Sequence, residues 1–238
     1  MAQPGKFHGM PIDAVIFDWG GTLTPWHTIA FDEEWRSVAQ VAAPDDVDAT
    51  TQRLLDAAAG IWARARSINS SGTFDEVCKL AGIVATDEHS AAYRAFWEPA
   101  TLTDPQVEPL FTRLRDDGVK IGVLSNTIWP REWHREIFVR DKVDHLIDGD
   151  VYTSEIPWTK PDPRAFEAAM ASVAVDDPAR CVFVGDRIFD DIFGANTVGM
   201  KSVFLPHSVV PEDQIARRGT PDAVISELAE VYDLLSSW

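Results

Sequence analysis

The chain has 238 residues, of which 45% are hydrophobic and 25% charged. This composition is that of a globular protein, and it excludes an intrinsically disordered chain. The length suits one α/β core with an inserted subdomain and is short for two independent domains. The formal net charge of -17 disfavours nucleic acid as a partner, because no basic surface is indicated that would release counterions from a phosphate backbone.

The cysteines and the apolar runs bear on the compartment. Cys78 and Cys181 lie far apart in apolar surroundings, which predicts neither a disulfide framework nor a zinc cluster. Residues Met1 to Pro11 lack the apolar core of a secretory signal, and no apolar run approaches the roughly 18 residues of a membrane span. We therefore expect a cytoplasmic protein without a membrane partner. The sequence leaves the oligomeric state open.

The first predicted strand is Ala14 to Phe17, a continuous apolar run that ends at Asp18. Such a run is typical of a strand buried on both faces, here with a carboxylate at its tip. Between about residues 31 and 101 the pattern is helical instead, and we expect a helical insertion that lies over the end of the first strand. Its predicted helices are Glu34 to Val41, Thr51 to Arg66, Phe74 to Leu80 and Glu88 to Trp97.

After the insertion, strands and helices alternate. Residues 107 to 114 carry apolar side chains at helical spacing, with Asp104 as the expected N-cap and Pro105 at the first helical position. Asp162 and Pro163 open another helix. Three more apolar runs end at polar or turn residues and are predicted strands: Lys120 to Leu124, Cys181 to Val184, and Ser202 to Leu205.

This alternation predicts an α/β fold with a doubly wound parallel sheet, whose ligand crevice lies beyond the carboxyl ends of the strands. Asp18, Ser125 and Asp186 are all expected at that edge. The predicted core comprises residues 1–27 and 102–238, and the predicted cap residues 28–101.

Four short motifs occur at the expected edge in chain order. They read Phe17-Asp18-Trp19-Gly20-Gly21-Thr22-Leu23-Thr24, Leu124-Ser125-Asn126, Lys160-Pro161-Asp162, and Gly185-Asp186-Arg187 continuing to Asp190-Asp191. Together they resemble the four motifs of the haloacid dehalogenase superfamily of hydrolases, and the resemblance covers essentially the whole chain. It implies a Rossmann-like core with a helical cap inserted after the first motif.

The resemblance implies that Asp18 is the nucleophile. A carboxylate can form an acyl phosphate, which splits one difficult displacement into two easier ones if the phosphoryl oxygens are neutralised. Lys160 and Ser125 would supply the cation and the hydroxyl for that task. The expected phosphate site also contains Thr22 and Asn126.

The expected cofactor is Mg²⁺, an oxygen-seeking cation that would bridge the nucleophile and a small phosphorylated substrate. The carboxylates of Asp18 and Asp186 are the natural ligands, and the family pattern adds the backbone carbonyl of Gly20. Asp191 stands at the usual spacing after Asp186 for orienting the metal shell or binding the ion, and Asp190 is the alternative.

Gly20 is the one departure from the family pattern that bears on chemistry. Most phosphatases of the family carry a second Asp at this position, which protonates the leaving oxygen and later activates water. General acid and base catalysis is typically worth about 10² to 10⁴-fold. His27, on the segment after the first strand, is a candidate substitute; the alternative is a histidine without a catalytic role. A leaving group that needs no proton would also tolerate the loss.

The same glycine keeps other functions open beside phosphatase. Phosphonoacetaldehyde hydrolases resemble this chain at the nucleophile, with Asp-Trp-Ala-Gly-Thr against Asp18 to Thr22, but they need a cap lysine, and only Lys79 lies in the insertion. Haloacid dehalogenases proper also lack the second Asp and work without metal. A non-catalytic protein that binds a phosphorylated ligand is the remaining alternative.

Substrate choice is expected to depend on the cap. Arg64 and Arg66 precede a polar loop between two cap helices and are candidates for binding a second anionic group, although both cannot share one helix face. Tryptophans near the motifs, among them Trp19, Trp129 and Trp133, either fill the interface between cap and core or line the substrate space.

Overall fold

The computed structural model describes residues 12–208 and 219–238. Its sheet is parallel throughout and has the order β3-β2-β1-β4-β5-β6. The strands are β1 (Ala14–Phe17), β2 (Lys120–Ser125), β3 (Gly149–Tyr152), β4 (Cys181–Gly185), β5 (Lys201–Phe204) and β6 (Ala223–Val224). The expectation for Met1 to Pro11 falls outside the described residues.

The helices follow the predicted division into an insertion and an alternating core. The insertion contains α1 (Phe31–Ala42), α2 (Val47–Ile68), α3 (Phe74–Leu80) and α4 (Asp87–Trp97). The core contains α5 (Val107–Asp116), α6 (Arg131–Arg140), α7 (Pro163–Ser172), the π-helix η5 (Ile188–Phe193), α8 (Gly194–Val198) and α9 (Glu230–Ser237). In the part of the chain that the structure describes, none of these helices has the length and hydropathy to cross a membrane.

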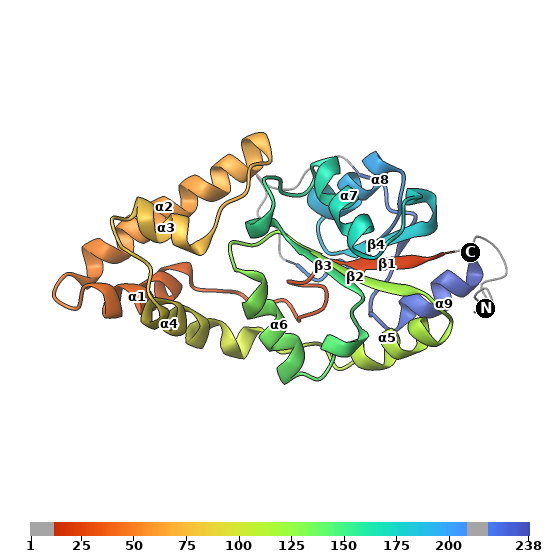
Figure 1. Ribbon diagram of the computed structural model, residues 1–238, viewed down its shortest axis with the longest axis horizontal. Helices are drawn as coiled ribbons and strands as arrows, with labels where there is room; N and C mark the ends of the chain where they lie inside the picture. Colours follow the sequence, from red (N-terminus) through yellow and green to blue (C-terminus); the bar gives the residue numbers. More distant parts are fainter. Residues whose placement is uncertain (1–11, 209–218) are drawn as a thin grey trace.

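The central strand β1 explains why the sheet is covered on both faces. Its four side chains are fully buried and alternate between two apolar clusters. Val15 and Phe17 belong to the cluster that contains side chains of α5 and α9, whereas Ala14 and Ile16 belong to the cluster of α7. Figure 1 shows α7 and α8 above the sheet and α5 and α9 below it. The predicted doubly wound α/β core is thus confirmed.

The helices α1 to α4 form a separate lobe, at the left of Figure 1, and are called the cap from here on. Each of these four helices includes the residues of a helix that the apolar spacing predicted. The cap is joined to the core by main-chain hydrogen bonds: Thr159 donates to the Asn69 carbonyl at 2.9 Å, Ser71 to Pro157 at 3.2 Å, and Phe74 to Ile128 at 2.8 Å. The exact boundaries, 28 and 101, stay a prediction.

Aromatic rings fill the rest of the interface between cap and core. The ring centre of Trp129, in the core, lies 6.0 Å from that of the cap residue Tyr93 and 5.3 Å from that of Trp19. The ring centres of Trp133 and Phe74 of α3 are 5.3 Å apart. Trp129 and Trp133 are both buried. These tryptophans therefore serve the first of their two predicted uses, packing between cap and core.

The structure corrects several predicted elements. The strands β3 and β6 were not predicted; β3 begins at Gly149, and β6 has only two residues. The helix expected from Asp104 begins at Val107, because the Asp104 carboxylate instead accepts a hydrogen bond from the Gln106 amide at 2.8 Å in a preceding turn. The strand β1 has the predicted bounds, and the other three predicted strands differ by one residue at their ends. The Asp162 cap of α7 is as predicted.

Candidate active site

The site lies where β1 and β4 end. The two strands are neighbours in the sheet, so the residues that follow them, Asp18 and Asp186, emerge side by side. The Asp18 amide donates to the Val184 carbonyl at 2.9 Å, which extends the ladder to the last position before the crevice. Both carboxylates are buried. A third, Asp191 of η5, has an oxygen within 4.8 Å of the other two.

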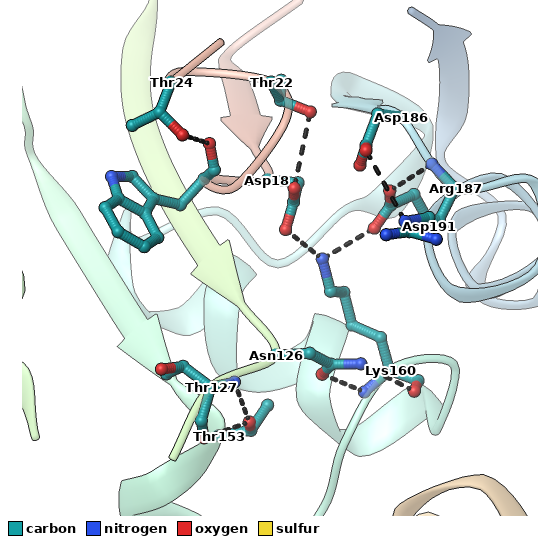
Figure 2. Close-up of polar contacts among 11 residues, drawn as sticks. Asp18, Thr22, Thr24, Asn126, Thr127, Thr153, Lys160, Asp186, Arg187 and Asp191 are labelled. Carbon is teal, nitrogen blue, oxygen red and sulfur yellow. Dashed lines mark hydrogen bonds and ion pairs between the residues drawn. The ribbon is translucent and has the colours of Figure 1, made fainter. Parts of the chain in front are cut away.

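Lys160 is the cation at the centre of the site. Its ammonium donates to Asp18 Oδ1 and to Asp191 Oδ1, each at 2.6 Å, as Figure 2 shows. Burial by itself would lower the pKa of Lys160, but the charges of Asp18 and Asp191 outweigh it and raise that pKa above its ordinary value. The lysine therefore stays charged and cannot release a proton near neutral pH.

Two glycines allow the carboxylates to lie this close together. A Cβ on Gly21, whose φ is +86°, would lie 2.4 Å from Asp186 Oδ2, and a Cβ on Gly185 would lie 2.4 Å from Asp191. Asp191 is fixed further because its Oδ2 accepts a hydrogen bond from the Arg187 amide at 2.8 Å. The backbone is thus shaped around the carboxylates of Asp186 and Asp191.

The Asp186 carboxylate provides a test of whether the site suits a cation. Both of its oxygens are buried without a hydrogen-bond partner among the described residues, and its closest cation is the Arg187 guanidinium at 3.6 Å. Burial raises the pKa of Asp186 well above the usual range and that of Asp191 to about 7, helped by the neighbouring carboxylates. Crowded carboxylate oxygens of this kind fit a hard divalent cation such as Mg²⁺.

The other predicted phosphate ligands surround Asp18. Thr22 donates to Asp18 Oδ2 at 3.4 Å, and Ser125 is the buried last residue of β2. Asn126 accepts from the Lys160 amide at 2.8 Å and donates to the Lys160 carbonyl at 3.1 Å. Asn126 therefore holds the lysine loop in place, a contact that the sequence motifs alone did not indicate.

The remaining predicted site residues lie outside this cluster. His27 is exposed and makes no hydrogen bond with a described residue, so its role as a substitute acid or base stays a prediction. The Gly20 carbonyl accepts no hydrogen bond from the described backbone, and its role as a metal ligand also stays a prediction. A Cβ on Gly20 would meet nothing within 4 Å. Lys79 is exposed on α3, which gives carbon–phosphorus cleavage no support. Asp190 is half-buried and outside the group of three.

The two cap arginines have different surroundings. The Arg64 guanidinium forms two hydrogen bonds with Glu76, at 2.8 and 2.9 Å, and donates to the Ser71 carbonyl at 2.6 Å. Both of its terminal NH2 groups are therefore bonded within the cap, whereas Nε is buried without a hydrogen-bond partner among the described residues. Arg66 is exposed and has no partner among the described residues, and its charge lowers the pKa of Asp190, although burial raises that pKa overall.

Sequence reasoning missed Arg187 as a member of the site. It follows Asp186 directly, and its guanidinium lies 5.0 Å from the ring centre of Trp26. Its place directly after a predicted metal ligand was a signal that could have found it.

Comparison with known proteins identifies the family. A family model described as haloacid dehalogenase-like hydrolase matches residues 12–199. Glyceraldehyde 3-phosphate phosphatase of Methanothermobacter thermautotrophicus is 27% identical over 55% of this chain and 58% of its own length, and the enzyme of the same name from Methanopyrus kandleri is 28% identical over 81% and 83%. The chain thus spans little more than half the length of the first of these relatives.

Two further proteins are similar over most of the chain. Phosphonoacetaldehyde hydrolase of Pseudomonas fluorescens is 26% identical over 82% of this chain and 72% of its own length. The crystal structure of a haloacid dehalogenase-type phosphatase from Thermococcus onnurineus superposes with a TM-score of 0.67 at 21% identity, covering 94% of this chain and 98% of that one. With the carboxylates and lysine described above, these matches establish that the chain belongs to the haloacid dehalogenase-like hydrolases.

Proposed function

We propose that the protein is a Mg²⁺-dependent phosphatase that acts on a small phosphorylated metabolite through an aspartyl-phosphate on Asp18. The observation that carries the proposal is the position of the Lys160 ammonium, 2.6 Å from both Asp18 and Asp191, in a site where the buried Asp186 carboxylate has no hydrogen-bond partner among the described residues. The family and its phosphatase-named members are consistent with it.

In the proposed first step, an Asp18 oxygen attacks the phosphorus of the substrate. The bond from phosphorus to the leaving oxygen breaks, and its electron pair goes to that oxygen. Lys160, Thr22 and Ser125 surround the transferred group and stabilise the negative charge on its oxygens. Mg²⁺, held by Asp18 and Asp186 with Asp191 beside them, would neutralise further phosphoryl charge.

In the second step, water attacks the phosphorus of the acyl phosphate, which releases inorganic phosphate and restores the Asp18 carboxylate. Gly20 presents no carboxyl group to protonate the leaving oxygen or to activate this water. The proposal therefore expects faster turnover of acyl and aryl phosphates, whose leaving groups are weak bases, than of alkyl phosphates.

The test is a comparison of the wild-type chain with Asp18→Asn, which keeps the side-chain shape. p-Nitrophenyl phosphate and acetyl phosphate are supplied with Mg²⁺ or with a chelator. We expect turnover that needs Mg²⁺ and falls at least about 10³-fold in Asp18→Asn. Equal rates in the two proteins, or full activity in the chelator, would refute the proposal.

A further inference from the structure

Arg187 stands out among the cations near the site because its side chain has no hydrogen-bond acceptor. The side chain is 26% exposed, its closest anionic atom is Asp186 Oδ2 at 3.6 Å, and its guanidinium carbon lies over the Trp26 ring. A guanidinium has five N–H donors, and those of a mostly buried arginine ordinarily find acceptors. Here none of the described residues supplies one.

Stacking on Trp26 explains why the guanidinium stays in place. The distance of 5.0 Å from the ring centre lies within the range of a cation–π interaction. A ring contact of this kind does not replace a hydrogen-bond acceptor, so the N–H donors of Arg187 still lack one among the described residues. Arg164 is stacked similarly, 4.6 Å from Trp158, but its donors are bonded to the Asp162 carboxylate. Arg187 is thus held in place by an aromatic ring, while its N–H donors have no acceptor among the described residues.

A second free cation comes from the cap. Arg66 lies in the last turn of α2, whose end is bonded to the core through Asn69 and Ser71. The Asn69 carbonyl accepts from the amide of Thr159, which directly precedes Lys160, so this end of α2 lies beside the lysine loop at the edge of the crevice. One charge belongs to the core and the other to the cap.

We infer that Arg187, supported by Trp26 and joined by Arg66 of the cap, binds a carboxylate that the phosphorylated substrate carries away from its phosphoryl group. The inference rests on the proposed phosphatase function and adds the substrate class. A carboxylate matches the paired donors of an arginine edge. A single negative charge also suits this place better than a second phosphate, because the Asp186 carboxylate already lies 3.6 Å from the Arg187 guanidinium.

The experiment uses two matched pairs of substrates that differ in a carboxylate. O-phosphoserine carries one and O-phosphoethanolamine does not; 3-phosphoglycerate carries one where glyceraldehyde 3-phosphate has an aldehyde. We expect wild type to prefer the carboxylated member of each pair. Arg187→Gln should lower kcat/KM for those members roughly 10- to 100-fold and change the others less than about twofold.

Three further variants complete the design. Arg66→Gln should reduce the same preference by a smaller factor, and Arg187→Lys should keep part of it through its charge. Arg164→Gln removes a stacked arginine whose donors are already bonded, and it should leave the preference unchanged. Because the readout is a ratio of substrates within each protein, a change in the amount of folded enzyme cancels.

Two outcomes would overturn the inference. An equal loss on all four substrates in Arg187→Gln would mean that Arg187 binds the transferred phosphoryl group or supports the metal site. A wild-type enzyme that does not distinguish the members of each pair would have no carboxylate site. Failure of the proposed function is separate, since it would appear as equal rates for wild type and Asp18→Asn on every phosphomonoester.

Discussion

The core side of the crevice and its edge hold their polar groups in different ways. On the core side, the carboxylates of Asp18 and Asp191 share one lysine, and glycines are required where the chain approaches Asp186 and Asp191. At the edge of the crevice, Arg66 and Arg187 have no hydrogen-bonding partner for their side chains among the described residues, and Gly20 borders open space. The comparison suggests that the reaction is fixed by the core, whereas substrate choice can vary at the edge.

The largest effect should follow from the removal of the core cation. Lys160→Met leaves two buried carboxylates facing each other without the ammonium between them, and it removes a donor to the phosphoryl group. We expect kcat to fall about 10³-fold. Arg164→Gln, which removes a cation whose donors are bonded to Asp162, serves as the control. A Lys160→Met enzyme within tenfold of wild type would contradict the description of the core side.

Adjacent glycines give a sharper test of the difference. Gly21→Ala would push a methyl group against Asp186 at a backbone φ of +86°, so we expect a loss of about 10² in kcat and of roughly 1 to 3 kcal/mol in the free energy of unfolding. Gly20→Ala meets nothing within 4 Å and should change neither quantity appreciably. Equal effects of the two substitutions in kinetics and urea unfolding would break the comparison.

The open space at Gly20 also permits a gain of function. Gly20→Asp adds a carboxyl group where the family usually carries its acid, without a steric contact at Cβ. We expect hydrolysis of an alkyl phosphate such as glycerol 3-phosphate to rise roughly 10- to 100-fold, with little change for acetyl phosphate, whose leaving group needs no proton. Gly20→Asn is the matched variant that cannot donate such a proton, and a similar gain in it would refute the explanation.

The smallest effect on turnover is expected in the cap, at Glu34. Its buried carboxylate accepts a hydrogen bond from Tyr93 at 2.5 Å, and burial raises its pKa to about 7. Because the folded state binds this proton more tightly than the unfolded state, the contribution of Glu34 to stability is fully present below about pH 4.5 and is lost as pH rises through about 7. The associated change in unfolding free energy is on the order of 3 kcal/mol.

Glu34→Gln should remove this part of the pH dependence and stabilise the protein at pH 8, measured by urea unfolding between pH 5 and 8. Glu33→Gln, on the exposed face of the same helix, should leave the pH dependence as in wild type. Identical pH profiles for wild type and Glu34→Gln would show that the buried carboxyl group does not titrate in this range.

The sequence predicted the fold largely through continuous apolar runs. The run Ala14 to Phe17 contains no polar residue, as expected of a strand that is covered on both faces of the sheet. Each predicted cap helix has an apolar face. The strand β3 was missed because Gly149 and Asp150 interrupt its apolar pattern. Asp150 is buried against Arg131 and Arg135, a long-range arrangement that local pattern reading does not detect.

The candidate site was predictable where a residue follows a strand directly. Asp18 and Asp186 follow neighbouring strands, so strand order alone brings them together. The difference between Arg64 and Arg66 depends on a tertiary contact, because only Arg64 has a hydrogen-bond partner among the described residues. Glu76 lies twelve residues beyond Arg64, on another helix, and no local spacing indicates that pair. The bond of Asn126 to the Lys160 loop is likewise a tertiary contact.

The most direct test of the account is to look for phosphate on Asp18 itself. Wild-type protein is mixed with acetyl phosphate and Mg²⁺, quenched in acid within the first turnovers, and digested for mass spectrometry. The account predicts one added phosphoryl group on the peptide that contains Asp18, and none in Asp18→Asn or without Mg²⁺. Substrate turnover without any label on that peptide, or equal labelling of Asp18→Asn, would contradict the assignment of Asp18 as the nucleophile.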